Sequence, residues 1–170
     1  AGPAPLDVAT RARLQRAQDD MAEAGLRVIA LAARHLPAEC PPGLEEQALA
    51  LCGLVGIADP PRAGVEAAIA TCHSAGIKLI MVTGDNPRTA LAIARQIGLV
   101  EGAALGVITG PELRRLHPAQ LQLALDAPEI LFARVAADQK MRIVEALKAK
   151  GQVVAMTGDG VNDAPALAAA

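Results

Sequence analysis

Two aspartates stand four residues apart in a glycine-rich stretch near the end of this 170-residue sequence. Residues 156–167 read MTGDGVNDAPAL and follow the apolar run 153–155. A stretch of similar form, Thr83-Gly84-Asp85, follows another apolar run. Carboxylates such as Asp159 and Asp163 suit Mg²⁺, a hard cation that prefers oxygen ligands. Because a threonine hydroxyl and glycine N–H groups can hold phosphate oxygens, the two stretches together predict chemistry on a phosphate group.

Lys140 and Asp163 each have two interpretations. Lys140 falls in the first turn of a predicted helix, where a positive charge opposes the helix dipole, so it is either an ordinary surface lysine or a group that neutralises phosphate charge. Asp163 is either the N-cap of a helix that starts at Ala164 or a cation ligand. Two carboxylates as close as Asp159 and Asp163 repel each other unless a cation lies beside them, which favours a metal site.

The elements that must position these residues alternate regularly in the second part of the chain. A helix over 7–24 and a strand over 27–32 come first and are followed by a proline-rich connector, residues 35–43. Strands are then predicted over 51–58, 77–82, 105–108, 130–133 and 152–156, with helices over 62–75, 87–98, 111–125 and 138–150. Alternation of apolar strands with helices is typical of an α/β fold whose parallel sheet is covered on both faces.

In a parallel sheet, ligands bind beyond the carboxyl ends of the strands. The residues predicted at that rim are Asp59, the Thr83-Gly84-Asp85 stretch, Arg134 and the Thr157-Gly158-Asp159 stretch. A single polar loop would mean little, but four of them at one rim favour a site. We therefore expect Thr83, Lys140, Asp159 and Asp163 to lie within a few ångströms of one another.

Composition excludes several other functions. The net charge of −2 and the pI near 5.9 provide no basic surface for nucleic acid. One phenylalanine, with no tyrosine or tryptophan, leaves almost nothing on which bases could stack. The three cysteines form no CxxC pair, and the three histidines have no metal-ligand spacing. A hydrophobic content of 52% argues against disorder.

Four segments together resemble the P-type cation-transporting ATPases, which belong to the haloacid dehalogenase superfamily. They are DPPR at 59–62, MVTGDNPRTALAIARQIGL at 81–99, FARV at 132–135 with Lys140 after it, and MTGDGVNDAPAL. The resemblance runs from about Gly25 to the end of the chain, with the motifs in family order. It implies a Rossmann-like fold, ATP as substrate and Mg²⁺ as cofactor.

The resemblance also implies roles for individual residues. Thr83, Gly84, Lys140 and Asn162 match the family's catalytic positions around the transferred phosphoryl group, and Asp159 and Asp163 match its metal site. Asp59 and Arg62 match the hinge between two domains. The family's nucleotide contacts match Arg27, Asp85 and Arg134. The family's nucleophile, the aspartate of Asp-Lys-Thr-Gly-Thr, has no counterpart in this sequence.

On this interpretation, residues 1–50 are the C-terminal part of a nucleotide-binding domain and 51–170 are most of a phosphorylation domain. The chain is then a cytoplasmic portion of an integral membrane protein. Its partners are the membrane helices, the actuator domain, the rest of the nucleotide-binding domain and the transported cation. Without the nucleophile, the chain alone is expected to be inactive. A free-standing phosphohydrolase of the same superfamily and a non-catalytic nucleotide- or Mg²⁺-binding module are the alternatives.

Overall fold

The structure, a computed structural model, describes residues 5–36, 47–102 and 105–170. It divides into two compact units, one ending at Asp59 and the other beginning at Pro60. This division falls later in the chain than the predicted boundary at 50/51, and the assignment of the two parts to domains of the family stays a prediction. Most of the predicted connector, residues 35–43, lies outside the described residues.

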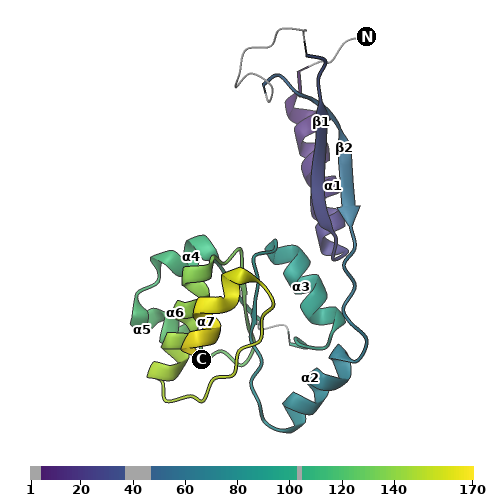
Figure 1. Ribbon diagram of the computed structural model, residues 1–170. Helices are drawn as coiled ribbons and strands as arrows, with labels where there is room; N and C mark the ends of the chain where they lie inside the picture. The colour runs from purple at the N-terminus through teal and green to yellow at the C-terminus, as the bar shows by residue number, and fades with distance from the viewer. Residues whose placement is uncertain (1–4, 37–46, 103–104) are drawn as a thin grey trace. The chain divides into compact units, whose positions relative to one another are not determined.

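The described residues of the first unit form one helix and one pair of strands (Figure 1). Helix α1 (Val8–Glu23) begins after Asp7, whose Oδ1 accepts a hydrogen bond from the Thr10 amide at 2.7 Å. Strands β1 (Arg27–Ala33) and β2 (Ala50–Ile57) pair antiparallel. The prediction that residues 51–58 belong to the parallel sheet is therefore wrong. An apolar run shows that a strand will form but does not specify its partner, and strands consecutive in sequence commonly pair.

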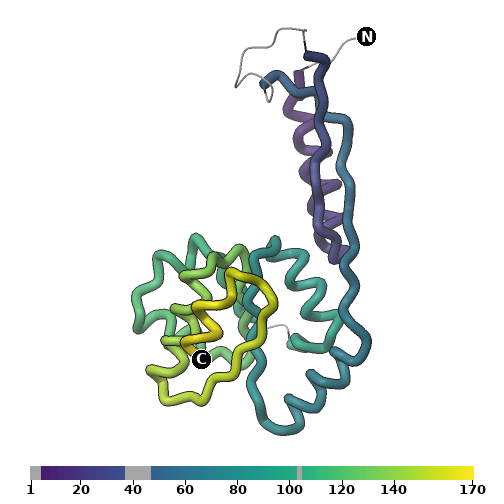
Figure 2. Tube along the Cα trace, in the orientation of Figure 1, coloured from purple at the N-terminus to yellow at the C-terminus, as the bar shows by residue number. Residues whose placement is uncertain are grey.

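The second unit contains a parallel sheet of three strands, which confirms the predicted α/β class. Its order is β3 (Met81–Val82), β5 (Ile130–Ala133) and β4 (Gly106–Thr109), with β5 in the centre. Figure 2 shows the course of the chain through this unit, from teal to yellow. Because all three strands run in the same direction, the residues after Val82, Thr109 and Ala133 leave the sheet at the same edge.

Six helices of the described chain belong to the same unit as this sheet. They are α2 (Val65–Ser74), α3 (Pro87–Gln96), α4 (Gly110–Arg115), α5 (Pro118–Ala124), α6 (Ala137–Ala149) and α7 (Ala164–Ala169), and a 3₁₀ turn, Val161–Asp163, precedes the last. Asn86 caps α3 as predicted, since its Oδ1 accepts from the Arg88 amide at 2.9 Å. The cap of α6 is Ala136 and not the predicted Asp138, which lies inside the first turn.

The core of the second unit is built on β5, whose four residues are all buried. Ile130 and Phe132 pack with apolar residues of α4, α5 and α6. Leu131 and Ala133, which point to the opposite face, pack with alanines of α3. Helices therefore cover both faces of the central strand, as expected for a parallel sheet.

The predicted last strand, residues 152–156, is absent. These residues have no strand conformation, and Val153 is fully exposed. An extended segment becomes a strand only when a neighbouring strand satisfies its N–H and C=O groups. Strand β3 is bonded only to β5 and lies at the edge of the described sheet. No described strand pairs with residues 152–156, so the prediction of a strand there is wrong.

Helix α4 is short, and side chains stabilise its first turn. The Glu112 carboxylate accepts hydrogen bonds from the backbone amide and the hydroxyl of Thr109, both at 2.7 Å. These hydrogen bonds hold the pKa of the Glu112 carboxyl below its usual value. The negative charge also lies near the helix N-terminus, where the dipole favours it.

Replacing the buried Leu113 with alanine should destabilise the second unit strongly. Its side chain is fully buried in the β5 core, so the change removes apolar contacts and leaves a cavity, at a cost of about 2–5 kcal/mol. The control Leu123→Ala removes a side chain that is 73% exposed and should change stability by about 0.5 kcal/mol or less. Urea unfolding measures both values, and equal effects would contradict this core.

Glu112→Gln should reduce stability more at pH 6 than at pH 3.5. The folded-state pKa of Glu112 is lowered, so its charge stabilises the fold above the unfolded-state pKa of about 4.3 and ceases to do so as pH falls through the folded-state pKa. Glutamine retains an acceptor for Thr109 and does not titrate. The urea midpoints of the two proteins should converge in acid. A gap between them that stays constant across this range would contradict the charge effect.

Candidate functional site

Lys140 and Asp163 form a close ion pair between the first turn of α6 and the residue before α7. The Lys140 Nζ donates to Asp163 Oδ1 at 2.6 Å, and the two side chains are only 14% and 12% exposed. Helices α6 and α7 lie side by side, which brings together residues that are far apart in sequence. Two of the four residues expected to meet at the rim therefore do meet.

The second oxygen of Asp163 holds its own loop. Oδ2 accepts from the Gly160 amide at 3.1 Å, and the Asp163 amide donates to the Gly160 carbonyl at 2.9 Å. The bond from Lys140, followed by the bond from Gly160, holds the pKa of the Asp163 carboxyl below its usual value. Asp163 stands at the N-cap of α7 but makes no capping hydrogen bond with its side chain. It therefore serves the lysine and the glycine-rich loop rather than the helix end.

Gly158, which was predicted at the rim without a role of its own, constrains this loop. A Cβ at this position would lie 2.7 Å from the side-chain atoms of Asp163. Only glycine lets the backbone pass so close to that carboxylate. Glycines on both sides of Asp159 were the available sign of such a close approach.

Thr83, at the end of β3, joins two neighbouring loops. Its hydroxyl donates to Asp85 Oδ2 at 2.9 Å and accepts from the Asp85 amide at 3.1 Å. Its carbonyl accepts from the Val135 amide at 3.1 Å. Gly84 is exposed, and a Cβ at this position would come no closer than 4.0 Å to the Val135 carbonyl. The structure thus places Thr83, Gly84 and Asp85 in one tight turn at the edge of the sheet.

The segment after β5 turns sharply at Arg134. Its φ of 55° lies in the left-handed region, which non-glycine residues rarely adopt. The Arg134 amide donates to the Asp85 carbonyl at 3.1 Å, while the residue itself is exposed. Phe132, the one aromatic residue that could have stacked on a base, is fully buried in β5. It therefore offers no stacking surface.

The remaining predicted site residues are exposed. Asp159 Oδ2 lies 4.0 Å from Arg62 Nη2, and their side chains are 96% and 90% exposed. Such an exposed pair contributes little to stability. Asn162 is exposed in the 3₁₀ turn. Arg27, at the start of β1, and Asp59 belong to the first unit and are exposed there.

The site is thus present as separate parts. Across residues 5–36, 47–102 and 105–170, no hydrogen bond or ion pair joins Thr83 or Asp159 to the Lys140–Asp163 pair. The same residues contain no cluster of three or more His, Cys, Asp or Glu side chains that could hold a metal. Asp159 is a candidate ligand because its carboxylate has only one loose contact. Asp163 Oδ1 faces an ammonium group, which would repel a cation.

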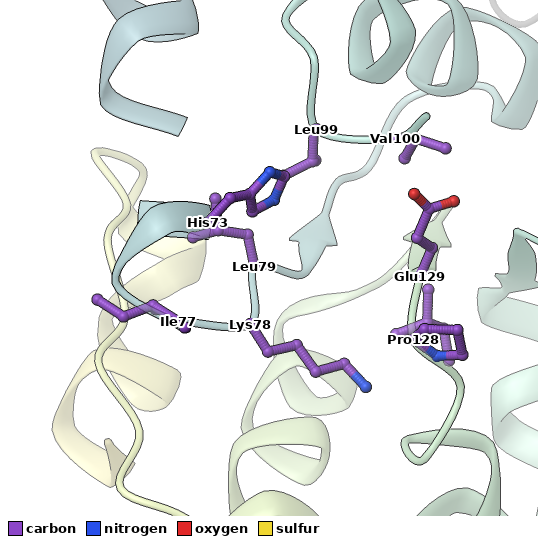
Figure 3. A pocket seen from close by; sticks show the side chains of 10 residues that line it. His73, Ile77, Lys78, Leu79, Leu99, Val100, Pro128 and Glu129 are labelled. Atoms are coloured by element: carbon purple, nitrogen blue, oxygen red, sulfur yellow. The ribbon is translucent and has the colours of Figure 1, made fainter. Parts of the chain in front are cut away.

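A cavity of about 290 Å³ lies away from these residues and contains none of them (Figure 3). Its charged side chains support the backbone. Lys78 Nζ donates to the Leu125 carbonyl at 2.6 Å and to the Ala127 carbonyl, and burial lowers its pKa. Glu129 Oε1 accepts from the Glu101 amide at 2.9 Å. The cavity therefore adds nothing to the candidate site formed by Thr83, Lys140, Asp159 and Asp163.

Comparison with known proteins decides the family. The family model described as haloacid dehalogenase-like hydrolase matches residues 7–170. The chain belongs to this family. The parallel sheet of the second unit is consistent with this family match. It is also consistent with the Rossmann-like fold that was predicted.

Several relatives are named as cation-transporting ATPases. The chain is 48% identical to a probable cation-transporting ATPase F of Mycobacterium tuberculosis over 169 residues, which cover 96% of the chain and 18% of that protein. It is 45% identical to the cation-transporting ATPase pma1 of Synechocystis over 161 residues (92% and 18%). For the calcium-transporting ATPase 1 of Saccharomyces cerevisiae the identity is 42% over 165 residues (95% and 17%).

This haloacid dehalogenase-like chain therefore spans 18% or less of the length of these three relatives. The resemblance to P-type cation-transporting ATPases is confirmed, and the chain corresponds to a fragment of such proteins. Among its described helices, none is both long and apolar enough to cross a bilayer.

Lys140→Ala should destabilise the α6–α7 contact. The change leaves the Asp163 carboxylate, which is only 12% exposed, without its ammonium partner. We expect a lower Tm and faster hydrogen exchange of the amides between Gly160 and Leu167. The control is Lys150→Ala, which breaks a pair with Asp126, a side chain that is 61% exposed, and should cost about 1 kcal/mol or less. If both variants lose the same stability, the Lys140–Asp163 pair is not a special contact.

Proposed function

We propose that this chain is the phosphoryl-handling part of an ATP-driven cation pump that passes through an aspartyl-phosphate intermediate. The observation that carries the proposal is the Lys140–Asp163 pair, which holds an ammonium group at the glycine-rich loop of a haloacid dehalogenase-like domain. The names of the relatives as cation-transporting ATPases support the pump.

In this proposal, Thr83 and Gly84 hold the oxygens of the transferred phosphoryl group, and Lys140 offsets their charge. The Lys140 ammonium carries three N–H donors, and one of them donates to Asp163. The other two N–H groups can donate to a phosphate. Asn162 completes the polar surroundings. Asp85 and Arg134 contact the nucleotide from this unit, and Arg27 does so from the first. Asp59 and Arg62 act as a hinge.

Asp159 fits the role of Mg²⁺ ligand. Its carboxylate is exposed, and its contact with Arg62 is loose enough to be displaced. A bound magnesium ion would supply positive charge to the phosphoryl oxygens. Asp163 was predicted as a second ligand. Because its Oδ1 is committed to Lys140, we now propose that it acts mainly by keeping that ammonium and the loop in place.

The nucleophilic aspartate is proposed to come from an Asp-Lys-Thr-Gly-Thr segment that this sequence does not contain. Among the described strands, β3 has a hydrogen-bonded neighbour on one side only. A parallel strand on its other side would end beside Thr83, and we propose that this is where the segment binds.

The wider assignments follow from the same proposal. Residues 1–50 are the C-terminal part of a nucleotide-binding domain, and 51–170 are most of a phosphorylation domain. Both are cytoplasmic portions of an integral membrane protein. The partners are the rest of that pump, with its actuator domain and membrane helices, and the cation that it transports.

Phosphoryl transfer tests this function directly. Incubated with Mg²⁺ and γ-labelled ATP, this chain alone should acquire no acid-stable, hydroxylamine-sensitive label, because it lacks the proposed nucleophile. A full-length protein that includes the Asp-Lys-Thr-Gly-Thr segment should acquire it. In that protein, Asp159→Asn should lower the label at least tenfold, since a neutral amide binds Mg²⁺ less well than a carboxylate.

The matched control is Asp138→Asn, which removes another exposed carboxylate from the same unit. It should leave the label near the wild-type level. Full labelling of the Asp159 variant would remove this residue from the metal site. Label on the short chain that Asp59→Asn abolishes would show that Asp59 is itself the nucleophile.

A further inference from the structure

Gln139 is one of the few polar side chains buried in the described structure, with 4% exposure. Both polar atoms of its side-chain amide make hydrogen bonds. Nε2 donates to the Gly110 carbonyl at 2.7 Å, and Oε1 accepts from the Ala136 amide at 3.0 Å. A buried amide must have such partners, because an unsatisfied one costs free energy comparable to a lost hydrogen bond. Gln139 therefore links the start of α4 to the segment that precedes α6.

The backbones at this link are in unusually close contact. A Cβ on Gly110 would lie 2.0 Å from the Arg134 carbonyl oxygen and 2.9 Å from Gln139 Oε1. Only glycine leaves room for the approach, so the segment after β5 rests directly on the residue that opens α4. The Gln139 amide fixes this contact from the side.

The linked segment continues to the phosphate site. Arg134 and Val135 donate their backbone amides to the Asp85 and Thr83 carbonyls, each at 3.1 Å. Arg134 itself has a φ of 55°, a conformation that needs support from its surroundings. The loops after β3 and β5 and the start of α4 thus form one chain of contacts. Gln139 is the buried side chain that joins the start of α4 to the segment after β5.

Arg142, one turn further along α6, provides a useful contrast. Its guanidinium donates to the Leu113 carbonyl at 2.8 Å and to the Leu116 carbonyl, at the other end of α4. Both side chains therefore tie α6 to α4. Only Gln139 contacts the segment that leads to Thr83.

We propose that Gln139 is a positioning residue for phosphoryl transfer. It holds residues 134–136 against Gly110, so that Thr83 keeps its place and Lys140, the next residue along α6, starts from a fixed backbone. This inference rests on the proposed function, and it concerns a residue that does not itself touch the phosphate.

The first test measures local opening in this chain. Gln139→Met fills a similar volume but cannot donate to Gly110 or accept from Ala136. The amides of Arg134 and Val135 should exchange at least tenfold faster relative to Leu131, in the centre of β5. Arg142→Met should lower overall stability without changing this ratio. An unchanged ratio in Gln139→Met would overturn the positioning role.

The second test measures the kcat and KM of ATP hydrolysis by the full-length protein, together with phosphoenzyme formation. Gln139→Met should lower kcat at least tenfold with little change in the KM for ATP, because ATP contacts persist while Thr83 and Lys140 lose their alignment. Arg142→Met should retain kcat. If exchange changes but kcat does not, Gln139 has only a structural role. If the wild-type protein forms no phosphoenzyme, the proposed function fails, and the exchange ratio still decides whether Gln139 fixes the segment.

Discussion

The burial of β5 on both faces is the constraint on which the second unit depends. Its residues alternate between the helices on one face and α3 on the other, so the strand cannot shift by one residue without reversing every contact. Because β5 is fixed in register, its last residue, Ala133, is fixed in position as well. Arg134 leaves the sheet at that end in a left-handed turn, and its amide and that of Val135 secure the neighbouring loop. The polar edge is therefore positioned by the core beneath it.

The Lys140–Asp163 ion pair at this edge positions its two charged groups more than it stabilises the fold. A poorly exposed ion pair recovers little net free energy, because both groups lose water. The Lys140–Asp163 pair nevertheless fixes the ammonium group at the loop, and Gly158 leaves room for the carboxylate that does so. Asp159, by contrast, is almost fully exposed. In the described chain, the Lys140 ammonium, which suits a phosphate, is thus held by an ion pair. The Asp159 carboxylate, which suits a metal, is exposed to solvent.

Much of this arrangement could be predicted from the sequence, wherever a feature depends on local pattern. The strand at 130–133 and the cap at Asn86 were correct because an apolar run and an Asn-Pro pair act over a few residues. Residues 51–58 were misassigned because an apolar run does not specify which strand it pairs with, and residues 152–156 were misassigned because no described strand pairs with them. Gln139 was missed for a related reason. A single glutamine in a helix looks like a surface residue until the backbone that it binds is in place.

These errors share one physical origin, and it bears on the proposed site. A parallel strand needs a neighbouring strand to bond with, and residues 152–156, which have no such neighbour in the described chain, lead directly into the loop that carries Asp159. Pairing of that segment would restrict the loop and so place the Asp159 carboxylate. Lys140 is already held by Asp163, so the ammonium can be in place before the metal ligand is. On the proposed function, the strand that brings the nucleophile to Thr83 would also order the aspartate that binds Mg²⁺. Nucleophile and metal site would then form together, so the proposed strand would serve the fold as well as the chemistry.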